Sequence, residues 1–139
     1  MTEDDIRRTA SEYELYSGQM NLFEKRLELV QSTIGEMEMT KIALQALKNK
    51  KEEDEFLSPI GSNSFIKAKF ADTNSILMGL GANIVAEISV DQALDELNKR
   101  RTEFQKLYSN LKNQITQLRL KLNDIRTKLE QQYARSQQK

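Results

Sequence analysis

The sequence predicts an α+β fold, in which a long antiparallel coiled-coil hairpin carries two β-hairpins between its arms. Two segments, 1–48 and 89–139, repeat apolar residues at alternating steps of three and four, which is the spacing of a coiled-coil seam. Between them, segment 56–88 alternates short apolar runs with turn residues, a pattern typical of strands. A charged linker at 49–55 precedes the strands, and we expect one elongated domain in all.

The two arms carry heptads in matching phase. In the first arm the seam residues are Ile6, Thr9, Tyr13, Tyr16, Met20, Phe23, Leu27, Val30, Ile34, Met37, Lys41 and Leu44. In the second arm they are Leu94, Leu97, Arg101, Phe104, Tyr108, Leu111, Ile115, Leu118, Leu122, Ile125, Leu129 and Gln132. Proline interrupts neither arm, and Ser89 or Asp91 can cap the second helix.

An antiparallel pairing of the arms places seam residue against seam residue. Facing pairs then have residue numbers with a constant sum of 138, as in Tyr16 with Leu122, Met20 with Leu118, Phe23 with Ile115, Leu27 with Leu111, and Ile34 with Phe104. Residues 1–55 hold 8 basic and 13 acidic side chains, whereas residues 99–139 hold 11 and 3, so the arms also attract one another. We predict an intramolecular hairpin with both chain ends at its tip. The alternative is two separate helices that join different partners.

Some seam positions depart from the apolar pattern. Lys41 and Arg101 are register or rim features, because long side chains can lift their charges out of a seam. Thr9 and Gln132 are polar seam residues close to the chain ends. We therefore expect a loosely packed, splayed tip that leaves a set of side chains partly uncovered: Ile6, Tyr13, Tyr16, Ile125, Leu129 and Tyr133.

The central segment predicts four strands, near 56–60, 64–70, 75–79 and 83–88, that form two β-hairpins. An isolated hairpin is marginal in water, and a thin coiled coil cannot cover four strands. We expect these strands to be completed by other subunits in an intersubunit β-barrel. The expected assembly residues are Leu57, Ile60, Phe65, Ile66, Ala68, Phe70, Ile76, Leu77, Met78, Leu80, Ile84, Val85 and Ile88.

Segment 57–101 resembles the α-class subunit of prefoldin, a co-chaperone family of archaea and eukaryotes. The shared elements are Leu57-Ser58-Pro59-Ile60-Gly61, Phe65-Ile66-Lys67-Ala68, Asp72-Thr73, Leu77-Met78-Gly79-Leu80-Gly81 and Asp91-Gln92-Ala93-Leu94. Four strands, in place of the single hairpin of the β class, indicate the α class. These motifs cover about a third of the chain, while the arrangement of arms and strands covers all of it.

The resemblance implies a hexamer of two α-class and four β-class subunits, built on a double β-barrel. It also implies that the coiled-coil tips hold non-native polypeptides without ATP and deliver them to a group II chaperonin. Weak contacts at several tips together give useful avidity. The candidate client-binding residues are Ile6, Tyr13, Tyr16, Met20, Leu122, Ile125, Leu129 and Tyr133; the alternative for each is ordinary seam packing.

Other functions find little support in the composition. The chain has no His or Cys and no phosphate-binding glycine loop, so we expect no enzyme, cofactor or metal. No apolar run reaches the length of a membrane span, and we expect a cytoplasmic protein. The basic last arm could meet nucleic acid, but the acidic first arm offsets it and we expect no such partner. The main alternative is a structural, filament-forming scaffold related to prefoldin.

Overall fold

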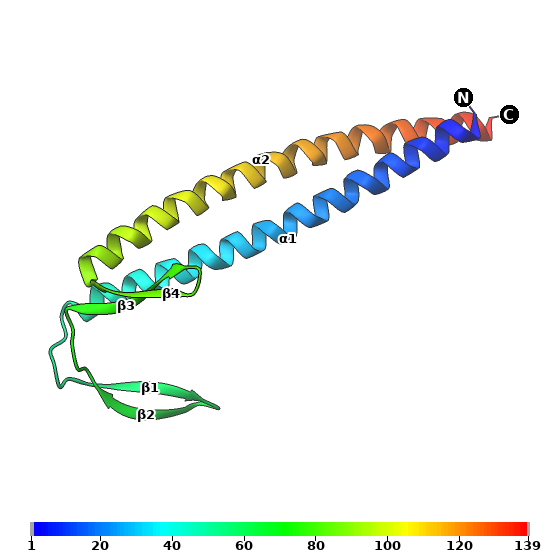
Figure 1. The fold of residues 1–139 in the computed structure, drawn as a ribbon. Coiled ribbons are helices and arrows are strands. Elements are labelled where there is room, and N and C mark those ends of the chain that lie inside the picture. Colours follow the sequence, from blue (N-terminus) through cyan, green and yellow to red (C-terminus); the bar gives the residue numbers. More distant parts are fainter. Residues whose placement is uncertain (1, 139) are drawn as a thin grey trace. The chain divides into compact units, whose positions relative to one another are not determined.

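The computed structural model describes residues 2–138. Helix α1 (Glu3–Leu47) is followed by strands β1 (Glu55–Gly61), β2 (Ser64–Lys69), β3 (Ser75–Gly81) and β4 (Ile84–Ser89), and then by helix α2 (Val90–Gln137) (Figure 1). The predicted combination of a long helical hairpin with two β-hairpins is confirmed. The chain divides into two compact units, residues 1–33 with 104–139 and residues 34–103, and each is described by itself.

The first unit is a pair of helical segments packed along a seam. Val30, Leu111 and Ile115 are buried, as their heptad positions predict. The Nε2 of Gln31 donates to the Tyr108 hydroxyl at 3.4 Å, and the Lys121 ammonium lies 4.2 Å from the centroid of the Tyr16 ring. Both pairs lie within one residue of the predicted antiparallel register.

The start of α1 is closed by a reciprocal cap. The Asp5 amide donates to the Thr2 hydroxyl at 3.4 Å, and the Thr2 amide donates to the Asp5 carboxylate at 3.2 Å. This bond from the Thr2 backbone lowers the pKa of Asp5. Two amides at the exposed helix end are thereby satisfied.

In the second unit, the end of α1 pairs with the start of α2. The guanidinium Nη1 of Arg101 lies 2.9 Å from the carboxylate Oε2 of Glu38. This charged seam residue therefore forms a specific ion pair near the strands. Ser89 caps α2, because its hydroxyl accepts from the Gln92 amide at 3.1 Å while the Gln92 side chain accepts from the Ser89 amide. Asp91, the other candidate cap, forms an ion pair with Lys48.

The four strands form two separate antiparallel sheets of two strands each, β1–β2 and β3–β4. Both hairpins close with a Gly-x-Asn turn in which three successive residues have positive φ: Gly61-Ser62-Asn63 and Gly81-Ala82-Asn83. A register shift precedes each turn, at Pro59/Gly61 and at Gly79/Gly81. Glycine and asparagine tolerate this left-handed backbone, so the sequence repeat accounts for the repeated turn.

The core of the second unit joins the β3–β4 hairpin to the helices. Met78 packs in a buried cluster with Leu44 of α1 and with three residues of α2: Val90, Ala93 and Leu97. Ile76 and Ile88 pack against this cluster, and Figure 1 shows the hairpin lying along the end of α1. Met78 was expected on an assembly surface, but it is 8% exposed because it packs into the chain's own core.

Candidate binding surfaces

Apolar side chains of the strands stand in solvent across both hairpins. Eight of the expected assembly residues are exposed: Leu57, Ile60, Phe65, Ile66, Leu77, Leu80, Ile84 and Val85. Four more, Ala68, Phe70, Ile76 and Ile88, are half-buried, and Met78 is buried. A soluble monomer rarely leaves so many neighbouring apolar residues uncovered, which indicates an interaction surface.

The β1–β2 hairpin exposes apolar groups on both of its faces. Phe65 is paired with Pro59 on one face, where Leu57 also lies, and it is 55% exposed. On the other face Phe56 and Ile66 are exposed as well. The Phe56 ring stacks on Phe70, with centroids 4.4 Å apart and planes at 27°. This aromatic pair ties the base of the hairpin together.

The β3–β4 hairpin is covered on one face and open on the other. Ile76 pairs with Ile88 and Met78 pairs with Ala86 on the covered face. Leu77, on the opposite face, is 73% exposed. This hairpin therefore belongs to the chain's own core through one face and offers a second face to a partner.

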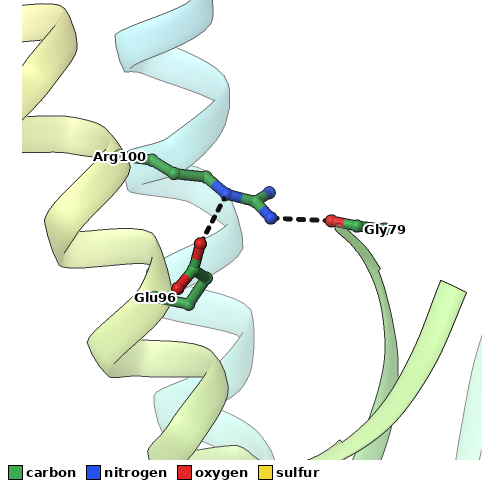
Figure 2. A network of polar contacts seen from close by, with 3 residues as sticks. All are labelled: Gly79, Glu96 and Arg100. Atoms are coloured by element: carbon green, nitrogen blue, oxygen red, sulfur yellow. Dashed lines mark hydrogen bonds and ion pairs between the residues drawn. The ribbon is translucent and has the colours of Figure 1, made fainter. Parts of the chain in front are cut away.

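The side chain of Arg100 in α2 binds the backbone of the β3–β4 hairpin. The guanidinium donates to the Gly79 carbonyl at 2.7 Å, and its Nε lies 3.4 Å from the Glu96 carboxylate (Figure 2). Glu96 lies one helical turn before Arg100 and orients the guanidinium toward the strand. The heptad pattern gives no sign of this contact, because neither residue is a seam position.

An apolar groove opens beside the end of α1. It is lined by Thr40, Ala43, Leu44, Ala46, Leu47, Lys50, Phe70 and Ile76 and has a volume of about 450 Å³. Most of the helical residues in this lining lie outside the seam, and Phe70 and Ile76 of the strand region complete the groove.

The candidate client-binding residues of the first unit differ in exposure. Tyr133 is 52% exposed, and six others are half-buried: Ile6, Tyr13, Tyr16, Met20, Leu122 and Leu129. The expectation that Ile125 lies partly uncovered is wrong, because it is 7% exposed. The polar residues Thr9 and Gln132, which were expected to open the seam, are themselves buried within it.

One cation–aromatic contact was not predicted from the sequence. The Lys121 ammonium lies over the Tyr16 ring, one of the candidate client-binding side chains. The predicted register pairs Tyr16 with Leu122, the residue after Lys121, so this neighbour could have been found from the pairing of the arms.

The described part of the chain, residues 2–138, lacks the features of a metal site and of a membrane-spanning helix. It holds no group of three or more acidic, histidine or cysteine side chains that could bind a metal ion. None of its helices combines the length and the apolar character that crossing a membrane requires.

A family model described as Prefoldin subunit matches residues 16–135. The chain belongs to the prefoldin subunit family. Prefoldin subunit alpha 1 of Thermococcus kodakarensis is 34% identical over 106 residues, which cover 75% of this chain and 73% of the relative. Prefoldin subunit alpha of Pyrococcus horikoshii is 27% identical over 128 residues, covering 91% and 86%. These relatives support an α-class prefoldin subunit.

Solved prefoldin structures share the fold. A chain of the filamentous PFD from Methanocaldococcus jannaschii, solved by cryo-EM, superposes with a TM-score of 0.71 at 22% identity, covering 83% of this chain and 95% of that one. The prefoldin beta subunit from Thermococcus strain KS-1 superposes with a TM-score of 0.59 at 15% identity, covering 91% and 90%. Prefoldin subunits are oligomeric co-chaperones and not enzymes, and this subunit is one of them.

Proposed function

We propose that this α-class prefoldin subunit works in a hexamer with a second α-class copy and four β-class subunits. The hexamer acts in the cytoplasm, holds non-native polypeptides at its coiled-coil tips without ATP, and delivers them to a group II chaperonin. In this proposal 1–48 and 89–139 are the arms, 49–55 is a linker and 56–88 is the assembly segment. The observation that carries it is the pair of two-stranded sheets with uncovered apolar residues.

The exposed strand residues supply the driving force for assembly. Complete burial of a large aliphatic or aromatic side chain stabilises by about 1.5–3 kcal/mol, and nine such residues stand exposed on the two hairpins: the eight expected assembly residues and Phe56. A two-stranded sheet also leaves backbone groups unpaired along its outer edges. Pairing with strands of neighbouring subunits buries the exposed apolar side chains and gives the unpaired backbone groups hydrogen-bond partners. Closing the strands into a barrel leaves no edge.

The tips supply the contacts with clients. Six half-buried apolar or aromatic side chains of the first unit, with exposed Tyr133 beside them, offer patches that need only small shifts to contact a client. Each patch binds weakly and with little selectivity, which suits clients of no fixed shape. Several arms in one assembly raise the overall affinity through effective concentration, and release stays possible.

The assembly is tested by the mass of the particle. We expect the chain mixed with a β-class subunit to give one discrete hexamer by native mass spectrometry. A polydisperse ladder that grows with concentration, from the chain alone and from the mixture, would instead support the filament-forming scaffold. A stable monomer in both samples would contradict the proposal.

The client function is tested by aggregation of a denatured protein in the absence of nucleotide. We expect the assembled hexamer to suppress aggregation, and we expect a variant without residues 1–12 and 130–139 to suppress it less while its mass shows intact assembly. Full activity of the trimmed hexamer would place the client site elsewhere. Transfer to a group II chaperonin is then followed by refolding of the held protein after chaperonin and ATP are added.

A further inference from the structure

Two polar residues interrupt the apolar seam of the first unit at neighbouring positions, where the predicted register sets Thr9 opposite Leu129 and Gln132 opposite Ile6; together they form its polar layer. Thr9 of α1 is 4% exposed and Gln132 of α2 is 3% exposed, so both are as deeply buried as the leucines of the seam. Both occupy heptad positions that a stable coiled coil fills with apolar residues. The layer lies within the first turns of α1 and the last turns of α2, next to candidate client-binding residues Ile6 and Leu129.

The polar side-chain atoms of this layer have few hydrogen-bond partners. The Thr9 hydroxyl donates to the Asp5 carbonyl of its own helix at 2.9 Å, so its proton does not serve Gln132. The Gln132 Oε1 is buried, and no donor among the described residues reaches it. Whether such an oxygen holds a trapped water or stays unpaired, it stabilises the closed seam less than a leucine would.

The surroundings make this layer easier to open than the rest of the seam. Both residues border a small cavity of about 180 Å³, whose other lining residues are Asp5, Arg8, Glu12 and Lys128. Parting the helices here returns the Gln132 carboxamide to water beside groups that are already hydrated. The next seam layer inward holds Ile125, which is buried and apolar, so parting that reaches this layer exposes apolar surface.

We propose that Thr9 and Gln132 weaken the seam and so let the first turns of α1 and the last turns of α2 part when a non-native polypeptide touches the tip. Parting uncovers Ile6, Ile125 and Leu129 for the client, and the buried state of Ile125 is then the closed state of the site. Thr9 and Gln132 act as positioning residues, because they control the opening and need not touch the client. The inference rests on the proposed client function of the tip.

Hydrogen exchange of the assembled hexamer reports the opening without a client, because terminal helical turns that leave the seam lose their packing and fray in water. We expect Gln132→Leu to slow amide exchange in residues 3–12 and 126–137 by about tenfold, because it removes an unsatisfied buried group. Thr9→Val should slow the same amides by a smaller factor. The matched control is Gln131→Leu at the exposed neighbouring position, which adds the same side chain outside the seam and should leave exchange unchanged.

Client capture by the same variants measures the consequence. We expect Gln132→Leu to weaken capture of a denatured protein several-fold, while Gln131→Leu captures at least as well as the unchanged hexamer. If amide exchange in Gln132→Leu is as fast as in the unchanged protein, the claim that this layer is weak is overturned. If exchange is slowed but capture of the denatured protein is undiminished, the role of the layer in client binding is overturned. If the unchanged hexamer captures no client, the proposed function fails, and the exchange data alone still decide whether the layer is weak.

Discussion

Hairpins β1–β2 and β3–β4 have the same length, the same register shift and the same Gly-x-Asn turn, yet they are covered very differently. In β3–β4, the face that carries Ile76 and Met78 packs on both helices. In β1–β2, the equivalent face carries Phe56 and Ile66, which are 39% and 51% exposed. One hairpin is thus part of the chain's own core, and the other has both faces free for partners.

The connections to the helices account for this difference. Strand β4 ends at Ser89 and helix α2 begins at Val90, so the hairpin is held against the helix that it leads into. Strand β1 begins only at Glu55, after seven residues that follow α1. This connection is charged and places no apolar residue against the helices. A repeated turn therefore produces two equal hairpins, and the connecting segments decide which of them is anchored.

The largest effect is expected from a charge on the free hairpin. Phe65→Asp places a carboxylate on the exposed apolar face of β1–β2, where burial in an assembly would require its desolvation. We expect loss of the hexamer in native mass spectrometry, with a change below about 0.5 kcal/mol in the unfolding free energy of the chain alone. The control is Lys67→Asp on the same face. An intact hexamer with Phe65→Asp would show that β1–β2 takes no part in assembly.

A smaller effect, on the stability of the chain alone and not on assembly, is expected in the anchored hairpin. Met78→Ala removes the side chain that packs against Leu44, Ala93 and Leu97, and should cost the chain alone about 2 kcal/mol in denaturant unfolding. Its control is Leu77→Ala, because Leu77 is the next residue of the strand and is 73% exposed. Equal losses from the two substitutions would remove the distinction between the faces of β3–β4.

The sequence was sufficient for the parts of the fold that rest on periodicity and turn chemistry. The heptads predicted both helices and their register, and the turn residues predicted both hairpins. It did not reveal which hairpin is anchored, because Ile76 and Ile66 lie in similar alternating patterns and only the packing separates them. The direct passage from Ser89 into α2 was the available signal.

The candidate sites were less predictable than the fold. Ile125 was expected uncovered because polar Thr9 and Gln132 share its seam, yet the helices stay paired around those two residues. Seam polarity predicts how much stability a layer contributes, and it does not by itself predict that the layer is open. The contact between Arg100 and Gly79 was missed because it depends on where a hairpin lies against a helix, which no local pattern records.

Arg100 offers a way to loosen the anchored hairpin without touching its core. Arg100→Met removes the donor to the Gly79 carbonyl and keeps much of the aliphatic stem. We expect a loss of about 1 kcal/mol, seen as roughly fivefold faster amide exchange in β3 and β4 and unchanged exchange in β1 and β2. Lys99→Met, at the exposed neighbouring position, is the control. Unchanged exchange in β3 would mean that the apolar contacts alone hold the hairpin.

The smallest effect is expected from acid, at the link between the two hairpins. The Asp72 carboxylate accepts from the Asn74 amide and the Ser75 hydroxyl, both at 2.8 Å, and these bonds lower the pKa of Asp72. A lowered pKa in the folded chain means that the stabilisation is present above the ordinary value of 3.8 and is lost as pH falls below it. We expect the Asn74 amide to lose exchange protection in that range, relative to the intrinsic exchange rate. Asp72→Asn should lack this pH dependence, and its persistence in the variant would assign it to another carboxylate.

The most direct measurement is hydrogen exchange of the two hairpins in the same chain, first as a dilute monomer and then in the hexamer with β-class subunits. We predict that the amides of β3–β4 are protected in both samples, whereas those of β1–β2 exchange at nearly unprotected rates in the monomer and become protected on assembly. Equal protection of β1–β2 and β3–β4 in the dilute monomer would contradict the claim that the free hairpin is completed by its partners.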